Sequence, residues 1–230
     1  IHDSFPRPTA KKVEQIIDGD SFKDKPIETD GECSLFVFKT IADPFVGKMT
    51  FFKVMSGTLT NDLTMKNVTS GTTEKMAHIY TMRGKKQTEV TSLCCGDIGM
   101  IAKLAGTNTN DTLTVSSDFE YRKIAFPHPY YTMAITPAAK GDEDKISTGI
   151  ARLLEEDKTL AYENNAETKQ MTISGLGDMQ LDVLVARMKS RYGTTVLLET
   201  PKIAYRETIK GTSDVEGKHK KQSGVSGQYG

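Results

Sequence analysis

The sequence predicts a mixed fold, in which an antiparallel β-barrel is followed by an α+β unit of the ferredoxin-like βαββαβ type. In the first half of the chain, short β-type runs alternate with glycines and other turn residues and show no helical period. The second half instead combines β-type runs with two segments of helical spacing. At roughly 100 to 200 residues per domain, 230 residues accommodate two small domains.

Residues 1–33 are predicted to form a linker ahead of the barrel. They are polar, contain three prolines, and carry only isolated apolar side chains such as Ile16, Ile17 and Phe22. Such a composition allows one short helical turn but supplies no packed face. The folded part of the chain should therefore begin near residue 34.

The barrel is predicted over residues 34–121. Runs rich in Phe, Val, Thr and Met predict strands at 36–41 and 50–55, and the Asp-Pro pair and the glycine between them supply a turn. Single glycines separate further runs of the same kind, at 59–68, 75–82, 89–93 and 98–104. Many short strands at nearly regular spacing favour a closed antiparallel barrel.

The α+β unit is predicted over residues 122–204. Its strands are expected at 130–135, 160–162, 170–173 and 195–198. The first helix should follow the acidic residues 142–144, which suit a positive helix N-terminus, and its apolar face is Ile146, Ile150, Leu153 and Leu154. The second helix should end at a C-cap on Gly193, and its core face is Leu181, Leu184, Val185 and Met188.

Composition excludes several broad classes of protein. Lys plus Arg and Asp plus Glu number thirty each, so no net charge attracts RNA or membranes and any nucleic-acid contact must be local. No apolar run approaches the roughly 20 residues of a membrane-spanning helix. Cys33, Cys94 and Cys95 lack the C-x-x-C spacing of zinc and redox sites, as expected in a reducing compartment. We therefore expect a soluble cytoplasmic monomer without a membrane partner.

The sequence lacks the motifs of a catalytic, cofactor or metal site. No G-x-x-x-x-G-K-[ST] loop is present, and Gly47-Lys48, its nearest approach, lacks the upstream glycine and the following hydroxyl. The four histidines are scattered and do not share ligand spacing with other metal-binding side chains. We expect this chain to be no enzyme and to hold no cofactor or metal.

The turn between the first two barrel strands is a candidate contact surface. It carries an apolar tip where solvent would favour polar residues, although a loop folded back on the barrel explains the pattern equally well. The candidate residues are Asp43, Pro44, Phe45, Gly47 and Lys48.

A basic run near the C-terminus is the second candidate. Lysines beside flexible glycines can follow an RNA phosphate chain, whereas a solvated charged strand is the simpler alternative. The candidate residues are Lys218, Lys220, Lys221 and Gln222.

Several segments resemble the bacterial elongation factor G family of translational GTPases. FVFKTIADPFVGKMTFFKVMSGTL at 36–59 is similar to the start of the family's second domain, a barrel of the translation-factor type. ISGLGDMQLDVLVARMK at 173–189 and PKIAYRETI at 201–209 resemble the third domain and its exit. EGKHKKQSGVSGQYG at 216–230 resembles the opening of the fourth domain, which we expect over 205–230.

The resemblance implies a role in translation. A GTPase domain, holding GTP with Mg, would precede residue 1, and the parent protein would be the enzyme. The two domains here would contact ribosomal RNA, small-subunit proteins and the parent's own GTPase domain. They would relay a rearrangement that moves tRNA and mRNA, with the turn at Phe45 and Lys48 among the contacts.

Two departures from the family leave alternatives open. The chain has Gln180 where the family usually reads His, and Val225-Ser226 where it usually reads Gly-Arg. A diverged paralogue in ribosome recycling, or a tetracycline-type ribosome-protection factor, would share the architecture. From another class, the second unit could be a regulatory ligand-binding or acyl-phosphate-hydrolysing domain, although the sequence offers no convergent Arg and Asn for the latter.

Overall fold

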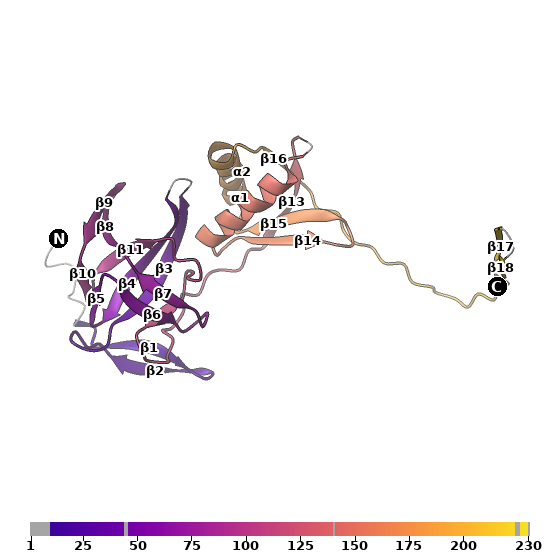
Figure 1. The fold of residues 1–230 in the computed structure, drawn as a ribbon. Coiled ribbons are helices and arrows are strands. Elements are labelled where there is room, and N and C mark those ends of the chain that lie inside the picture. The colour runs from indigo at the N-terminus through magenta and orange to yellow at the C-terminus, as the bar shows by residue number, and fades with distance from the viewer. Residues whose placement is uncertain (1–9, 44–45, 140, 224–225, 230) are drawn as a thin grey trace.

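The computed structural model describes residues 10–43, 46–139, 141–223 and 226–229. Figure 1 shows two bodies in sequence, a strand-rich body formed by the N-terminal half and a smaller body with two helices. An extended segment then leads to a hairpin of β17 (Lys220–Ser223) and β18 (Ser226–Tyr229). The predicted order of a barrel and an α+β unit is confirmed.

The barrel is built almost wholly from one curled antiparallel sheet. Eight strands pair in the order β7-β6-β12-β3-β4-β11-β8-β9, and β5 and β10 form a separate pair. The strands of this body are β3 (Ser34–Asp43), β4 (Gly47–Ser56), β5 (Thr58–Thr60), β6 (Leu63–Asn67), β7 (Thr73–Met76), β8 (Ile79–Arg83), β9 (Lys86–Val90), β10 (Ser92–Cys94), β11 (Ile98–Ala102) and β12 (Thr112–Thr114).

Two predicted strands are each divided in the structure. The run at 59–68 breaks at a turn in which Asp62 takes the left-handed backbone conformation, with φ of 64°. The run at 75–82 breaks at Ala77 and His78, between β7 and β8. Two-residue interruptions, at 61–62 and 77–78, therefore divide the runs where the residue pattern alone suggested one strand.

Alternating side chains of the curled sheet fill the barrel interior. The buried cluster is Cys33, Leu35, Val37, Phe52, Val54, Leu59, Met65, Met76, Ile79, Leu93, Ile101, Leu104 and Leu113. Gly99 on β11 fits closely against this core, because a Cβ there would lie 2.7 Å from Cζ of Phe52. The packing therefore leaves no room for a larger residue at position 99.

A buried polar cluster ties β6 to the segment between β11 and β12. The Asp111 carboxylate accepts hydrogen bonds from Nδ2 of Asn67 at 2.8 Å and from the backbone N–H of Asn108 at 2.7 Å. Asn67 is fully buried and also donates to the Thr107 hydroxyl at 3.3 Å. These bonds compensate the cost of burying a carboxylate and an amide.

A β-hairpin precedes the barrel, where the sequence predicts a linker with at most a helical turn. Strands β1 (Val13–Asp18) and β2 (Ser21–Pro26) pair with each other, so Ile16, Ile17 and Phe22 lie on strands. Ile17 N–H donates to Glu120 O at 2.8 Å, and the Arg122 guanidinium lies 4.8 Å from the centroid of Phe22. The helical expectation was wrong, because long-range contacts stabilise these strands.

The second body has the predicted βαββαβ order. Its strands are β13 (Tyr131–Pro137), β14 (Ala161–Asn165), β15 (Gln170–Gly175) and β16 (Val196–Glu199), paired antiparallel in the order β14-β15-β13-β16. Helices α1 (Glu143–Glu156) and α2 (Asp178–Tyr192) lie on the same side of this sheet (Figure 1).

Both helices contribute the apolar faces that the sequence predicts. Ile146, Ile150, Leu153, Leu181 and Leu184 are buried in the second core. Gly193 caps α2 with φ of 65°, and its N–H bonds to Met188 O, as the C-cap prediction requires.

Candidate functional site

The described ends of the β3–β4 turn are held together by a side-chain hydrogen bond. An Asp43 carboxylate oxygen accepts the backbone N–H of Val46 at 2.8 Å, and Gly47 has φ of 86°. Pro44 and Phe45 lie outside the described residues. Lys48 is half-buried and its Nζ donates to Asn108 Oδ1 at 2.8 Å, which ties it to the barrel. The contact role of this turn stays a prediction.

Burial and charge act in opposite directions on the Lys48 ammonium. Burial lowers the pKa of Lys48, whereas the nearby carboxylates, that of Glu155 foremost, favour its charged form. Glu155 belongs to α1 of the second body, so Lys48 lies within the electrostatic reach of the junction between the two bodies.

The second predicted set lies elsewhere. Lys218 is exposed on the extended segment and Lys220 is exposed on β17, which also contains Lys221 and Gln222. Figure 1 places this hairpin apart from both bodies, so the structure does not bring the two predicted sets together. RNA contact by this run also stays a prediction.

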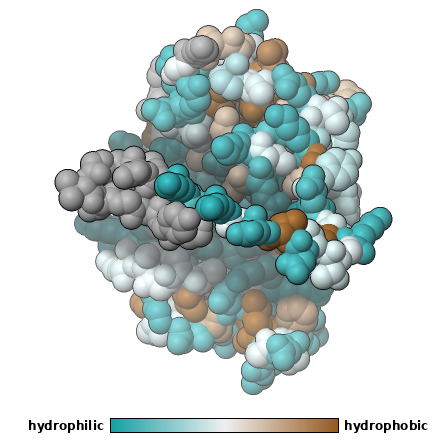
Figure 2. Space-filling model, turned by 90° about the vertical axis from the view of Figure 1, so that its right-hand side faces the viewer, coloured by the Kyte–Doolittle hydropathy of each residue, from teal (hydrophilic) through white to brown (hydrophobic). Residues whose placement is uncertain are grey.

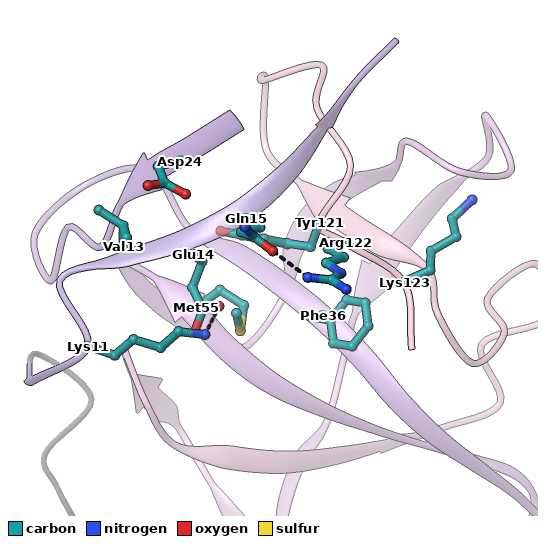
Figure 3. A pocket seen from close by; sticks show the side chains of 10 residues that line it. All are labelled: Lys11, Val13, Glu14, Gln15, Asp24, Phe36, Met55, Tyr121, Arg122 and Lys123. Atoms are coloured by element: carbon teal, nitrogen blue, oxygen red, sulfur yellow. Dashed lines mark hydrogen bonds and ion pairs between the residues drawn. The ribbon is translucent and has the colours of Figure 1, made fainter. Parts of the chain in front are cut away.

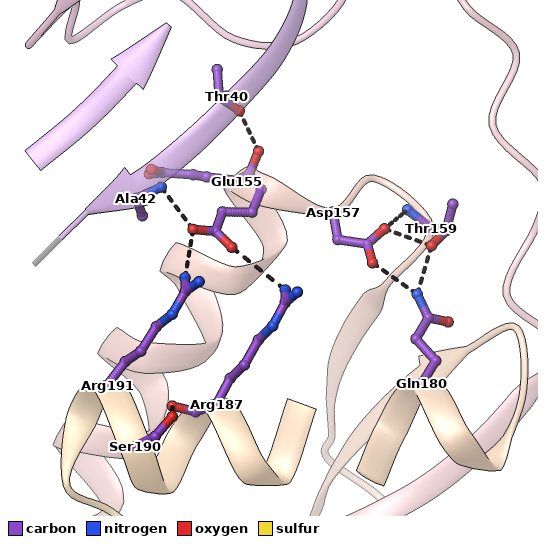
Figure 4. A network of polar contacts seen from close by, with 10 residues as sticks. Thr40, Ala42, Glu155, Asp157, Thr159, Gln180, Arg187, Ser190 and Arg191 are labelled. Atoms are coloured by element: carbon purple, nitrogen blue, oxygen red, sulfur yellow. Dashed lines mark hydrogen bonds and ion pairs between the residues drawn. The ribbon is translucent and has the colours of Figure 1, made fainter. Parts of the chain in front are cut away.

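Strand β3 meets the C-terminal end of helix α1 at a polar junction (Figure 4). The Thr40 hydroxyl donates to the backbone oxygen of Glu155 at 2.5 Å. The backbone N–H of Ala42 donates to Oε1 of Glu156 at 2.9 Å. These bonds join the barrel directly to the α+β body.

Glu156 connects three elements at this junction. Its side chain is only 9% exposed, and besides Ala42 it contacts Arg191 at 2.8 Å and Arg187 at 3.6 Å. The two arginines are four residues apart on α2, so they project from the same face of the helix. A nearly buried carboxylate thus has two cations and one N–H to compensate its desolvation.

Asp157 and Gln180 form a second polar cluster beside the first (Figure 4). Asp157 accepts hydrogen bonds from Thr159 N–H at 2.9 Å and from Gln180 Nε2 at 2.8 Å. Burial alone would raise the pKa of Asp157, but these hydrogen bonds and the charge of Arg187 lower it. Gln180 also accepts the N–H of Leu176 at 2.6 Å. Its amide therefore fixes the start of α2 to the turn that follows α1.

An apolar patch surrounds the start of α2. Leu176, Met179 and Val183 are 50%, 76% and 48% exposed, and the two helical residues are one turn apart on one face. Tyr131, 39% exposed, lies opposite Gly175 in the sheet next to Leu176. Neighbouring exposed apolar side chains of this kind mark contact surfaces. The patch was not predicted from the sequence, although Met179 and Val183 lie outside the apolar spacing of the α2 core face.

Figure 2 shows a face on which hydrophilic residues predominate and hydrophobic ones are scattered. On the part of the chain that the structure describes, no group of three or more potential metal ligands occurs. Neither described helix combines the length and the apolar composition needed to cross a membrane.

A hollow of about 450 Å³ separates the β1–β2 hairpin from the barrel (Figure 3). Its cations are already engaged: Lys11 pairs with Glu14 at 2.6 Å and Arg122 donates to Gln15 at 2.6 Å. Phe36 and Tyr121 line the same space. We interpret it as the packing gap of the hairpin.

Comparisons with known proteins agree with this architecture. Residues 32–116 match the family described as Elongation factor G domain 2, and residues 126–200 match Elongation Factor G, domain III. The chain is 41% identical over 215 residues to an elongation factor G-like protein from Thermotoga maritima, covering 93% of this chain and 31% of that protein.

A crystal structure of a protein from Thermus thermophilus has the same fold. It matches 99% of this chain with a TM-score of 0.81 and 28% sequence identity, and 32% of that protein is covered. The chain thus spans about a third of the length of these relatives. Because two consecutive domains of one family together match more than half of its length, the chain belongs to the elongation factor G family.

Proposed function

We propose that this chain is the ribosome-binding and signal-relay part of a translational GTPase that moves tRNA and mRNA during protein synthesis. The observation that carries this proposal is the position of Glu156, whose one carboxylate connects the barrel, α1 and α2. This contact gives a rearrangement of either body a direct route to the other.

Helix α2 offers a route for the signal. The apolar patch lies at its start, and the arginines that hold Glu156 lie toward its end. A helix of 15 residues is about 22 Å long and moves as a rigid rod. We assign the patch to the parent's GTPase domain, so that a displacement there would be delivered to the barrel.

The nucleotide belongs to a part of the parent protein beyond this chain. No phosphate-binding loop occurs in the sequence, so these residues do not fit GTP. GTP with Mg would be held by the GTPase domain. The partners of this chain would be ribosomal RNA, small-subunit proteins and that domain, in a monomeric cytoplasmic protein.

A diverged role in ribosome recycling or tetracycline-type ribosome protection is the second candidate. Gln180 favours it, because its amide uses both its donor and its acceptor to fix the start of α2, at a position where the family usually has His. Hydrolysis of GTP on ribosomes without movement of tRNA would identify this alternative.

The proposal can be tested on the full-length protein. We expect ribosome-stimulated GTP hydrolysis together with translocation, measured by toeprinting of mRNA. Glu156→Gln should slow translocation more than hydrolysis, because it weakens the relay and leaves the GTPase domain intact. Asp182→Asn, an exposed acid on α2, is the matched control. Failure of ribosomes to stimulate hydrolysis by the wild-type protein would reject the proposal.

A further inference from the structure

A hollow of about 550 Å³ lies beside the β3–β4 turn, where residues of β7 and β9, the two end strands of the barrel sheet, both line it. Its buried floor includes Ile101 and Leu104, and Val46 from the turn lines its rim. Tyr80 on β8 and Gln87 on β9 line another part of it. The hollow thus combines an apolar floor, an aromatic ring and an amide, and its volume suits a small organic group.

Most charged groups that line this hollow are already engaged. Lys75 pairs with Asp62 at 2.8 Å, and His78 pairs with Glu89 at 2.7 Å. Glu74 accepts the N–H of Gly106 at 2.8 Å. These groups are held by the barrel itself, so they offer little free charge to a ligand.

Lys103 is the exception. Its ammonium has no hydrogen bond or ion pair within the described residues, and its side chain is exposed at the rim. Its backbone φ is 66°, a left-handed conformation that residues other than Gly, Asn and Asp seldom adopt. Its N–H bonds to Lys48 O at 2.7 Å, which holds it beside the β3–β4 turn. Backbone strain of this kind accumulates at functional positions.

A basic hairpin tip continues from the same rim. Gln87 pairs with Met82 across β8 and β9, and the next pair is Arg83 with Lys86. Gly84 and Lys85 form the turn between them, with φ of 57° at Gly84. Across the ranges that the structure covers, these three cations have no acidic partner and all are exposed. Such a row of charges attracts a phosphate chain.

We propose that this hollow takes one unstacked nucleotide of single-stranded RNA. The base lies against Tyr80 and the apolar floor, its polar edge meets Gln87, and its phosphate meets Lys103. The neighbouring phosphates follow the basic tip at 83–86. Stacking of a base on an aromatic ring with cations along the backbone is the usual mode of single-strand binding. This inference rests on the proposed function, since it names the RNA element that the barrel would hold.

The test uses the 230-residue chain and a fluorescein-labelled RNA hexanucleotide of adenosines, followed by anisotropy at low salt. Tyr80→Ala should weaken binding about tenfold, whereas Tyr80→Phe should retain it, because stacking needs the ring and not the hydroxyl. Lys103→Asn removes the charge but tolerates the left-handed backbone, and should lower the slope of log K against log salt by about 0.7.

Matched controls separate the site from general effects. Tyr130→Ala removes an 86% exposed tyrosine of the other domain, and Lys23→Asn removes an exposed lysine of β2. Both should bind RNA as the wild type does. Wild-type affinity in folded Tyr80→Ala and Lys103→Asn would overturn the inference, as would capture of an extended peptide in the hollow without RNA binding.

Sedimentation with small ribosomal subunits distinguishes the two proposals. If the chain sediments with subunits and Tyr80→Ala leaves RNA binding unchanged, only the nucleotide site is wrong. If the chain binds the oligonucleotide through Tyr80 but never sediments with subunits, the site stands and the ribosomal role is wrong.

Discussion

The barrel and the α+β domain differ in how much of their apolar surface they bury. The barrel curls its sheet around one core and buries polar groups such as Asn67 and Asp111 within it. The α+β domain covers one side of its sheet and leaves Leu176, Met179 and Leu197 half-exposed or more. The barrel also exposes Ile98 and Val115, but the α+β domain exposes more such side chains and is built to be covered by another surface.

The two cores are also separate. The barrel cluster contains residues up to Leu113, and the second cluster begins at Met133. The contacts described at the junction are hydrogen bonds that involve Thr40, Ala42 and Glu156, not a shared apolar core. Each domain should therefore unfold by itself.

The largest effect should come from Phe52→Ala in the barrel core. Phe52 is 1% exposed, so its truncation should cost about 3 to 5 kcal/mol in the barrel. Hydrogen exchange measured by mass spectrometry should become faster in barrel peptides and stay unchanged in the α+β peptides. Leu197→Ala, at a half-exposed position, is the control. Equal loss of protection in both domains would show that they fold as one unit.

Glu156→Ala should act on the relation between the domains. The Ala42 N–H and both arginines lose their acceptor, but the arginines can be hydrated, so we expect a cost of about 1 to 2 kcal/mol in the α+β domain. Spin labels at Cys94 and at Lys189→Cys, with Cys95→Ser, should report a broader distance distribution. Glu163→Ala, at an exposed position of β14, is the control and should leave the distance distribution unchanged. An unaltered distribution in Glu156→Ala would refute the role of the junction.

Gly193→Ala should destabilise only the α+β domain, by about 1 kcal/mol, because φ of 65° is unfavourable for alanine. Gly193→Asn should recover part of the loss, since Asn tolerates this conformation. Urea unfolding followed by two-dimensional NMR gives the stability of each domain. If Ala and Asn have the same effect, the cap does not depend on the left-handed backbone.

The smallest effect concerns pH and the ends of the barrel. Glu32 accepts hydrogen bonds from the N–H of Ser116 and from Ser117, which joins the start of the barrel to its end. Burial alone would raise the pKa of Glu32, but these hydrogen bonds outweigh it and lower the pKa from 4.5 to about 2. A lowered pKa means stability that is present above pH 4.5 and is lost as the pH falls toward 2.

Because Glu32 is exposed, solvent screening should keep this contribution below about 1 kcal/mol. Barrel stability, measured by urea midpoints at several pH values, should fall less with acid in Glu32→Gln than in the wild type. An NMR titration of Glu32 with a midpoint near 4.5 would contradict the structure.

Local patterns predicted most of the fold. The apolar spacing of α1 and α2 and the glycine at position 193 are determined within a few residues, so the sequence suffices to locate them. The β1–β2 hairpin was missed because its support comes from Glu120 and Arg122, about a hundred residues away in the chain. Such long-range support leaves no periodic signal in the strands themselves.

The candidate site was predicted less completely. The sequence singled out the turn at Asp43 and Lys48 but could not reveal that Lys48 is tied to Asn108. The contact between Ala42 and Glu156 spans 114 positions and uses a backbone N–H, which every residue type except proline has. No residue pattern marks such a contact before the fold is known.

The polar character of the junction has a thermodynamic consequence. Neither hydrophobic cluster extends from one domain into the other. Separating the two domains would therefore expose mainly polar groups to water. Exposure of apolar surface is the source of the large heat-capacity change of unfolding. Separation of the domains should therefore have only a small heat-capacity change, and its van't Hoff plot should be nearly straight. Unfolding of each domain should instead give a curved dependence of free energy on temperature. The enthalpy of separating the two domains would then be nearly the same at all temperatures.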